Sequence, residues 1–269
     1  MPFLELQDLK THFPVRGGGL IPKTTETIKA VNGVSFEIAK GEILGLVGES
    51  GCGKSTLSRT VMQLQPATSG TVTLDGEELT SLPKNEVRNR RLDFQMIFQD
   101  PYASLNPRMT VFSTLAEAIC QRHPKLKKDK NLTNKVIELM STVGLDPRFM
   151  KKYPHEFSGG QRQRIAIARA LAPEPKLVIA DEPVSAIDVS IQSQSINLLL
   201  DLRDKLGITM IFISHDLSVV RYLADNIAVM YSGKIVEYGE ADEVFLNPKH
   251  QYTRKLLSAI PHLKEQAPA

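Results

Sequence analysis

The sequence is poor in the residues that build several classes of protein. Its 269 residues include no tryptophan and two cysteines, Cys52 and Cys120. Two cysteines exclude a disulfide framework or a cysteine-rich zinc cluster, and they fit a reducing compartment. Apolar runs such as 208–213 are far shorter than the roughly 20 residues that cross a bilayer, and the N-terminus lacks the long apolar stretch of a signal peptide. We therefore expect a chain that is not exported and that reaches a membrane only through partners.

An excess of charge of one sign is also missing. The 33 basic and 30 acidic residues give a net charge of +3, which does not predict a nucleic-acid partner. Hydrophobic residues make up 42% of the chain and charged residues 23%, an ordinary globular composition. We expect one large core, or a core with a smaller second unit, and no nucleic acid.

Short apolar segments alternate with helical patterns along most of the chain. The pattern predicts strands at 43–47, 94–98, 176–180 and 208–213 and helices at 55–64, 161–171 and 191–206. This order is typical of an α/β fold with a mostly parallel sheet covered on both faces.

Two further regions differ from this alternation. Strands are expected at 3–12, 33–38 and 70–74, with the glycine- and proline-rich stretch 14–22 as a loop between the first two. Between about 102 and 153 the apolar residues follow helical spacing, which predicts a helical subdomain.

The strongest motif is a glycine-rich string between the strand 43–47 and the helix that follows it. Its residues are Gly48, Glu49, Ser50, Gly51, Cys52, Gly53, Lys54, Ser55 and Thr56, which have the spacing of a P-loop. Glycines let the backbone wrap phosphates, and the helix N-terminus favours negative charge. Lys54 is expected to neutralise the β and γ oxygens, and Ser55 to ligate Mg²⁺. The sequence therefore predicts a nucleotide site.

Two carboxylates end the strand 176–180. Asp181 and Glu182 follow it directly, at the strand end where ligands of open α/β sheets bind. We expect Asp181 to hold Mg²⁺ through a coordinated water and Glu182 to polarise the attacking water as general base. In isolation, the same residues are equally typical of a simple turn.

Two polar residues follow neighbouring strands. Gln99 comes after the strand 94–98, and its amide can donate and accept, which suits a residue that contacts both Mg²⁺ and the attacking water. His215 comes after the strand 208–213 and is placed to donate to a γ-phosphate. Purely structural roles are the alternative for both.

A second string opens a helix in the same way as the P-loop does. Ser158, Gly159, Gly160 and Gln161 offer a hydroxyl, glycine amides and a helix N-terminus, which together make an anion site. One ATP needs one P-loop, so we interpret this string as serving another nucleotide across a dimer interface. As an isolated string it is more typical of a helix cap.

Together these strings resemble the ATP-binding cassette (ABC) ATPases over nearly the entire chain. The resemblance equates 48–56 with Walker A, Gln99 with the Q-loop, 158–161 with the signature, Asp181 and Glu182 with Walker B, Asp188 with the D-loop and His215 with the switch histidine. The segments 99–108, 153–161 and 247–254 look like the oligopeptide and dipeptide importer ATPases, a group that includes cationic antimicrobial-peptide uptake systems.

The resemblance implies a P-loop NTPase fold with a mostly parallel core sheet, an N-terminal antiparallel β subdomain and a helical subdomain. It predicts one ABC ATPase domain over 1–269. The expected parts are a RecA-like core with the antiparallel subdomain at 1–98 and 160–240, a Q-loop and helical signature subdomain at 99–159, and a short helical extension at 241–269.

The resemblance also implies a function, that of an ATPase with ATP and Mg²⁺ that powers a bacterial peptide importer. Such subunits form a nucleotide-sandwich dimer, with themselves or with a paralogous ATPase, and dock on two transmembrane permeases at the cytoplasmic face of the plasma membrane. A peptide-binding protein delivers the cargo outside. The alternatives are an importer of nickel, glutathione or haem, and a non-transport ABC ATPase.

Three positions depart from the family pattern or await a role. Ile187 stands where leucine is usual, and Gln251 stands where this branch usually has proline. An aromatic residue near the N-terminus is expected to stack on adenine, and Phe13 is the candidate; a core phenylalanine at the end of a strand is the alternative.

Overall fold

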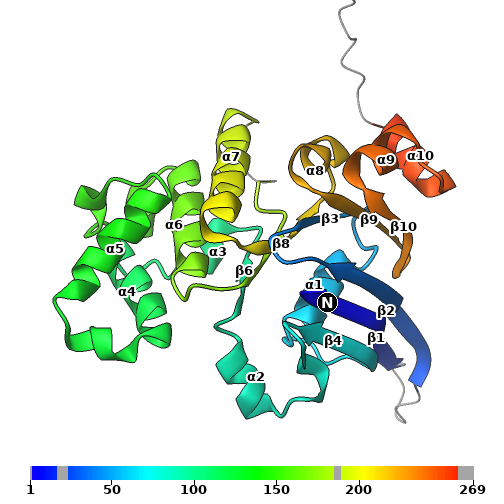
Figure 1. Cartoon of the computed structure of the whole chain (residues 1–269), viewed down its shortest axis with the longest axis horizontal. Coiled ribbons are helices and arrows are strands. Elements are labelled where there is room, and N and C mark those ends of the chain that lie inside the picture. The colour runs from blue at the N-terminus through cyan, green and yellow to red at the C-terminus, as the bar shows by residue number, and fades with distance from the viewer. Residues whose placement is uncertain (1, 17–23, 185–188, 260–269) are drawn as a thin grey trace, which may run out of the picture.

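The computed structural model describes residues 2–16, 24–184 and 189–259, and within them the strands form two sheets (Figure 1). One is antiparallel, in the order β2-β1-β4-β5, and the other has the order β10-β9-β3-β8-β7-β6. The first sheet comprises β1 (Leu4–Arg16), β2 (Thr24–Ile38), β4 (Ser69–Leu74) and β5 (Glu77–Glu78). The second comprises β3 (Ile43–Val47), β6 (Phe94–Ile97), β7 (Leu177–Asp181), β8 (Thr209–Ser214), β9 (Asn226–Tyr231) and β10 (Lys234–Glu240).

Helices surround both sheets. They are α1 (Lys54–Val61), α2 (Lys84–Arg90), α3 (Pro101–Ser104), α4 (Val111–Arg122), α5 (Asn131–Thr142), α6 (Gly159–Leu171), α7 (Val189–Leu206), α8 (Leu217–Leu223), α9 (Ala241–Leu246) and α10 (Gln251–Ser258). Short 3-10 turns occur at Leu79–Ser81, Pro124–Lys128, Pro147–Phe149 and Pro154–Glu156. Over the described ranges, no helix has the length and apolar character needed to cross a membrane.

The six-stranded sheet is parallel except at β10, which pairs antiparallel with β9. Every residue of β3 and β8 is buried, as expected for strands covered on both faces. The register pairs Val47 with Ser214 and Asp181 with Ile213. The carboxyl ends of β3, β8 and β7 therefore lie at the same edge of the sheet. The predicted α/β fold class is confirmed.

The expected loop at 14–22 is wrong in its first part. β1 continues to Arg16, and its last residues pair with β2, for example Pro14 with Thr27 and Arg16 with Thr24. Beyond Lys10, β1 pairs with β2 alone among the described strands. An edge strand tolerates proline, since one side of its backbone forms no ladder hydrogen bonds. Pairing with β2 thus extends a strand that propensity alone would end.

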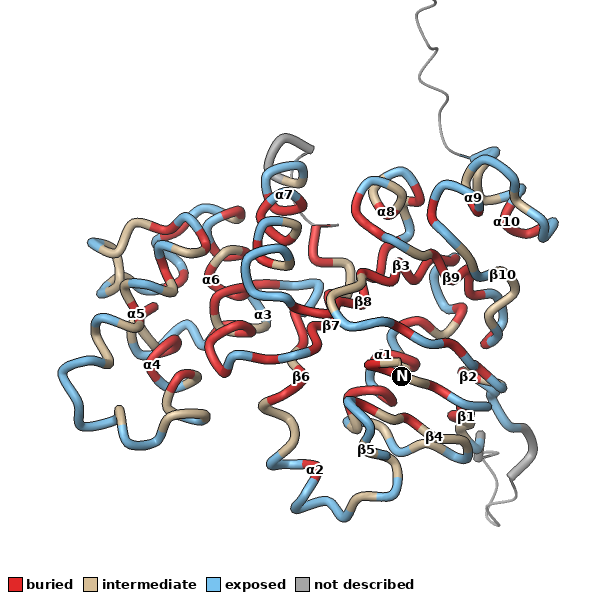
Figure 2. Tube along the Cα trace, in the orientation of Figure 1, coloured by how far each residue is buried: buried red, intermediate tan, exposed pale blue. Residues whose placement is uncertain are grey.

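Two apolar clusters hold the layers together, and the buried strands run through the middle of the tube in Figure 2. One cluster joins the six-stranded sheet to α4–α9, and the other joins both sheets to α1. Leu57 and Val61 of α1 belong to the second cluster, and the Thr60 and Thr11 hydroxyls lie 2.9 Å apart. α1 is thus fixed between the two sheets, with its N-terminus at the carboxyl end of β3.

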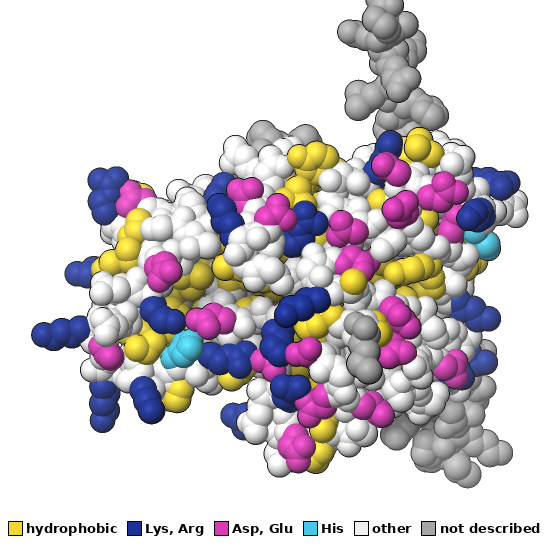
Figure 3. Space-filling model, viewed as in Figure 1, with side chains coloured by type: hydrophobic (Ala, Val, Ile, Leu, Met, Phe, Trp, Pro, Cys, Tyr) yellow, Lys and Arg dark blue, Asp and Glu magenta, His cyan; other side chains and the backbone are white. Residues whose placement is uncertain are grey.

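Residues 99–159 contain α3, α4, α5 and three of the 3-10 turns, and these helices occupy the left of Figure 1. Helices α9 and α10 pack at the opposite end, beside β9 and β10. The subdomain boundaries given above remain predictions. On the face shown in Figure 3, basic and acidic side chains are intermingled.

Candidate nucleotide-binding site

The P-loop runs from β3 into α1, and its glycines are required by close packing. Gly53 is the N-cap of α1 with φ +114°, and none of the side chains that the structure describes caps this helix. A Cβ at Gly53 would lie 2.1 Å from the Ala30 carbonyl oxygen, and one at Gly48 would lie 2.2 Å from the Met230 carbonyl oxygen. The first amides of α1 therefore have no side-chain acceptor, which is the arrangement that binds anions.

Lys54 lies inside this loop as the sequence predicts. Its side chain is buried, at 6% exposure, and Nζ donates to the carbonyl oxygens of Gly48 at 2.6 Å and Glu49 at 3.1 Å. A buried ammonium needs oxygen acceptors. Here the P-loop supplies them from its own backbone, and phosphate oxygens are the same kind of acceptor.

Asp181 and Glu182 stand at the end of β7, beside the P-loop. Glu182 has a positive φ of +45°, and its amide donates to the Ile213 carbonyl at 3.0 Å. A left-handed backbone is uncommon for a residue with a side chain, and such strain concentrates at functional sites. The turn directs the chain away from the sheet immediately after the two carboxylates.

Ser55 and Asp181, two of the three predicted Mg²⁺ ligands, are in contact. Burial, followed by the charge of Glu182, raises the pKa of Asp181. A hydrogen bond from the Ser55 side chain, together with the charges of Arg59 and Lys54, opposes that rise in pKa. A half-buried carboxylate beside a hydroxyl is an oxygen-rich pair of the kind that Mg²⁺ prefers.

Glu182 is contacted by the two polar residues that follow neighbouring strands. Their predicted contacts with Mg²⁺, the attacking water and the γ-phosphate stay predictions. Gln99 Nε2 donates to Glu182 Oε2 at 3.2 Å, and His215 Nδ1 lies 3.3 Å from the same oxygen. Gln99 and His215 are exposed, whereas Glu182 is partly buried. These residues come from the ends of β6, β7 and β8, which neighbour one another in the sheet. The geometry fits a positioned general base.

The string 158–161 forms the start of α6 and caps itself. The Gln161 amide donates to Ser158 Oγ at 3.4 Å, and the Ser158 amide donates to Gln161 Oε1 at 3.0 Å. This is a capping box. α6 lies among the helices on the left of Figure 1, whereas α1 lies between the sheets on the right. Within one chain, the structure does not bring this string to the P-loop.

Two predicted residues keep roles that stay predictions. Phe13 is half-buried in β1, opposite Ile28 of β2, and its proposed stacking on adenine stays a prediction. Asp188 lies outside the described residues.

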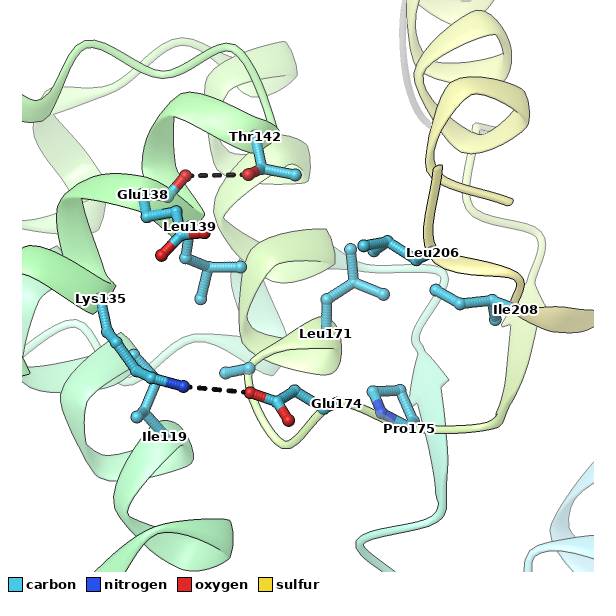
Figure 4. A pocket seen from close by; sticks show the side chains of 11 residues that line it. Ile119, Lys135, Glu138, Leu139, Thr142, Leu171, Glu174, Pro175, Leu206 and Ile208 are labelled. Carbon is cyan, nitrogen blue, oxygen red and sulfur yellow. Dashed lines mark hydrogen bonds and ion pairs between the residues drawn. The ribbon is translucent and has the colours of Figure 1, made fainter. Parts of the chain in front are cut away.

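Two cavities lie away from the P-loop. One, of about 320 Å³, is walled mainly by apolar residues of α4, α5, α6 and the end of α7, and Figure 4 shows the Lys135–Glu174 ion pair at 3.2 Å on its rim. The other, of about 460 Å³, includes Met96, Phe98 and Arg169. Phe98 directly precedes Gln99, so this second groove adjoins the site.

One residue at the site was not predicted from the sequence. The Tyr252 hydroxyl of α10 accepts a hydrogen bond from the Glu49 amide of the P-loop at 2.9 Å. The sequence marked Tyr252 only as part of the segment 247–254. Spacing and periodicity contain nothing that places residue 252 beside residue 49, because that contact depends on how β9 and β10 return the chain to β3.

Comparison with known proteins agrees with this geometry. The family model for ABC transporters matches residues 31–185, more than half of the chain. The chain belongs to the ABC transporter ATPase family. A second model, for the C-terminal region of oligopeptide and dipeptide transporters, matches residues 236–268.

Individual relatives cover most of this ABC ATPase. It is 53% identical over 262 residues to the oligopeptide transport ATP-binding protein OppF of Bacillus subtilis (strain 168), with 96% of this chain and 82% of that protein covered. It is 52% identical over 259 residues to OppF of Salmonella typhimurium, with 96% and 77% covered. The glutathione import ATP-binding protein GsiA of Pectobacterium atrosepticum is 50% identical over 265 residues, with 97% of this chain and 41% of that protein covered.

Solved structures share the architecture. The dimeric structure of MJ0796, a bacterial ABC transporter cassette, superposes with a TM-score of 0.77 at 27% identity, over 88% of this chain and 98% of that chain. The same cassette in a post-hydrolysis state, bound to ADP and Pi, gives a TM-score of 0.75 at 28% identity, again over 88% and 98%. The predicted family, fold class and ATPase function are confirmed.

Proposed function

We propose that this ABC ATPase powers a bacterial importer for peptides. The observation that carries the proposal is the C-terminal match at 236–268 to the oligopeptide and dipeptide transporters. Relatives of about 50% identity that are named for oligopeptide transport support it. Glutathione import is the second candidate, since a relative of 50% identity is named for it.

The proposed hydrolysis is performed by residues on one edge of the sheet. Lys54 and the amides of the P-loop bind the phosphates, and Ser55, Gln99 and Asp181 hold Mg²⁺. When bound, ATP would supply the phosphoanhydride bond that is broken, and Mg²⁺ would neutralise part of the charge on its phosphates. Glu182 accepts a proton from the attacking water on its carboxylate.

Three further parts complete the proposed mechanism. Gln99 and His215 hold the carboxylate of Glu182 in place, as their contacts with Oε2 indicate. Phe13 stacks on adenine. The string 158–161 and Asp188 act across an interface with a second ATPase, which is a copy of this chain or a paralogue. The capped, exposed start of α6 is consistent with a surface offered to another subunit.

The proposed membrane partners dock at the groove of about 460 Å³ next to Gln99. Phe98 and Leu64 in this groove are 41% and 49% exposed, which provides apolar surface for a helix of one transmembrane permease. A pair of ATPases would in this way dock on two permeases. Docking there places the chain at the cytoplasmic face of the plasma membrane. When Gln99 moves as nucleotide binds or leaves, the shape of the adjoining groove then changes as well.

Uptake by whole cells tests the cargo. A strain that lacks this gene is complemented with the natural gene or with a Lys54→Ala copy, and uptake of a labelled tripeptide, glutathione and nickel is compared. We expect only the natural gene to restore tripeptide uptake, and both strains to take up the other two solutes equally. Restored uptake of glutathione or nickel instead of tripeptide would identify the alternative importers.

A further inference from the structure

Helix α10 touches the nucleotide site from outside the ATPase motifs. The Tyr252 side chain is buried at 7% exposure, and its ring packs on Tyr231 with centroids 4.3 Å apart. Its hydroxyl accepts the Glu49 amide hydrogen at 2.9 Å. A residue of the C-terminal region thus makes a direct hydrogen bond to the backbone of the P-loop.

This bond and a bond from Lys54 hold the same peptide unit. The Gly48 carbonyl accepts from Lys54 Nζ at 2.6 Å, and the Glu49 amide donates to Tyr252 at 2.9 Å. That carbonyl and that amide belong to one peptide bond, which is planar and rigid. Anchoring both of its ends fixes how this part of the P-loop is turned toward the Lys54 side chain.

The start of α10 is itself tied to the core sheet. Glu237 of β10 accepts hydrogen bonds from the amides of Lys249 at 2.7 Å and His250 at 2.9 Å. His250 Nδ1 in turn accepts the Tyr252 amide at 3.1 Å. Burial acts to raise the pKa of Glu237, but the hydrogen bonds from these amides hold it below its ordinary value. The anchor of α10 is therefore a carboxylate bound by several donors.

A second contact from the same side supports the loop. The Gly233 amide, in the turn between β9 and β10, donates to the Cys52 carbonyl at 2.9 Å. The outer side of the P-loop therefore rests on the chain between β9 and α10, and Tyr252 is the side chain that provides a hydrogen bond there.

We propose that Tyr252 is a positioning residue for the P-loop, through which the C-terminal extension sets the affinity for nucleotide. The proposal rests on the nucleotide site assigned above to the P-loop. In the structure, Lys54 and Tyr252 share the task of orienting the Gly48–Glu49 peptide. When Lys54 donates to phosphate oxygens in place of the Gly48 carbonyl, the bond to Tyr252 remains to hold that peptide.

The variant Tyr252→Phe tests the proposal, because it removes the hydroxyl and keeps the ring packed on Tyr231. In the nucleotide-free protein, we expect faster hydrogen exchange at the Glu49 amide, followed by NMR or mass spectrometry. Loss of one hydrogen bond predicts an increase of about two- to tenfold in the Kd and the KM for ATP, with kcat unchanged. A role only in packing would lower the fraction of active protein, and so kcat, without a change in KM.

Two further variants separate the possible failures. Tyr231→Phe removes the hydroxyl of the other ring in the same pair, which is 45% exposed, and should leave both the exchange rate and the Kd as in the natural protein. Lys54→Ala tests the P-loop as the nucleotide site by itself, since its failure to weaken ATP binding would overturn the proposed function. If Lys54→Ala behaves as expected, unchanged exchange at Glu49 or an unchanged Kd in Tyr252→Phe overturns the role of Tyr252.

Discussion

The starts of α1 and α6 are both glycine-containing helix N-termini, yet their backbone amides differ in their hydrogen-bond acceptors. α1 begins after Gly53 with no side-chain cap. α6 begins after Ser158, whose hydroxyl accepts from Gln161 while the Gln161 side chain accepts from Ser158. Every helix start leaves amides to be satisfied. At α6 side chains of the string itself accept from the Gln161 and Ser158 amides, whereas at α1 none of the described side chains accepts from the first amides.

The surroundings of the two helix starts differ in the same sense. The P-loop is packed against β2, β9 and α10 on its outer side, and Lys54 is buried within it. Ser158 and Gln161 are exposed. A binding site built from residues of one chain needs this internal packing, whereas residues that contact a second subunit must be exposed on the surface. This difference supports the proposal that α1 binds nucleotide within the chain and that α6 faces a neighbour.

Among the variants proposed here, Glu182→Gln should change the ATPase rate the most, while both helix starts keep their contacts. Loss of a general base lowers kcat by about 10²–10⁴-fold, while the P-loop still binds ATP. The start of α6 on one chain then stays engaged with the ATP of another, so we expect dimers in ATP by size-exclusion chromatography. The control is Glu243→Gln, an exposed carboxylate 4.0 Å from Lys249, which should hydrolyse normally. Near-normal turnover in Glu182→Gln would remove its role as base.

Lys54→Ala tests the α1 side of the comparison. Lys54 Nζ is placed to donate two charge-assisted hydrogen bonds to phosphate oxygens in place of the Gly48 and Glu49 carbonyls, each worth about 1.5 kcal/mol at the lower end of the usual range. Their loss predicts a rise in the Kd for ATP of about 10²-fold, measured by fluorescence of a labelled ATP analogue. Lys255→Ala is the control, since Lys255 lies 3.6 Å from Glu49 but is exposed. Equal affinities in both variants would contradict the proposed binding of phosphate by Lys54, and with it the P-loop as the nucleotide site.

The sequence predicted the local parts of this site better than its assembly. The strands 43–47 and 208–213 were placed within a residue or two, because strands buried on both faces are continuous apolar runs. The glycine spacing of the P-loop and the carboxylates after β7 are local features as well. Spacing identified the capped start of α6, but a cap and an anion site share the same residues. Its structural cap is now visible.

Other features depend on long-range pairing and were not predicted. Arg16 belongs to a strand only because β2 pairs with it. The contact between Tyr252 and Glu49 joins segments that no short-range pattern connects. Strand order decides both, and a single sequence contains no direct record of which strands become neighbours.

Ser158→Ala tests the α6 side. Loss of the cap costs about 1 kcal/mol of stability, while ATP binding to the P-loop should remain within about twofold, because α6 does not reach it in the same chain. We expect the ATPase rate to fall about five- to tenfold, the effect of one lost hydrogen bond to nucleotide. Thr110→Ala is a matched control, since Thr110 caps α4 through the Ser113 amide. A similar loss of activity in both variants would make the effect of Ser158 one of stability.

The smallest expected effect is the change in Tm of the nucleotide-free protein caused by Asp181→Asn. This variant tests whether the uncompensated charge of Asp181 destabilises the empty nucleotide site. Burial and the neighbouring Glu182 raise the pKa of Asp181 in the folded protein. A carboxyl whose pKa is raised by folding contributes stability below its unfolded pKa, and that contribution is lost as pH rises through the folded pKa. Asparagine carries no charge at any pH. The nucleotide-free variant should therefore melt on the order of 2 °C higher at about pH 8.

The difference in Tm between Asp181→Asn and the natural protein should disappear as the pH falls below about 4, the ordinary pKa of an aspartate, because the carboxyl is then protonated in both the folded and the unfolded protein. Asp75→Asn gives the opposite sign, because a hydrogen bond from Lys176 and its charge lower the pKa of Asp75. That variant should melt lower at neutral pH, with the difference again closing in acid. If Asp181→Asn also melts lower at neutral pH, the Ser55 hydrogen bond outweighs the repulsion from Glu182. In that case the charges of Asp181 and Glu182 would not destabilise the nucleotide-free protein, and a bound cation would have no such repulsion to relieve.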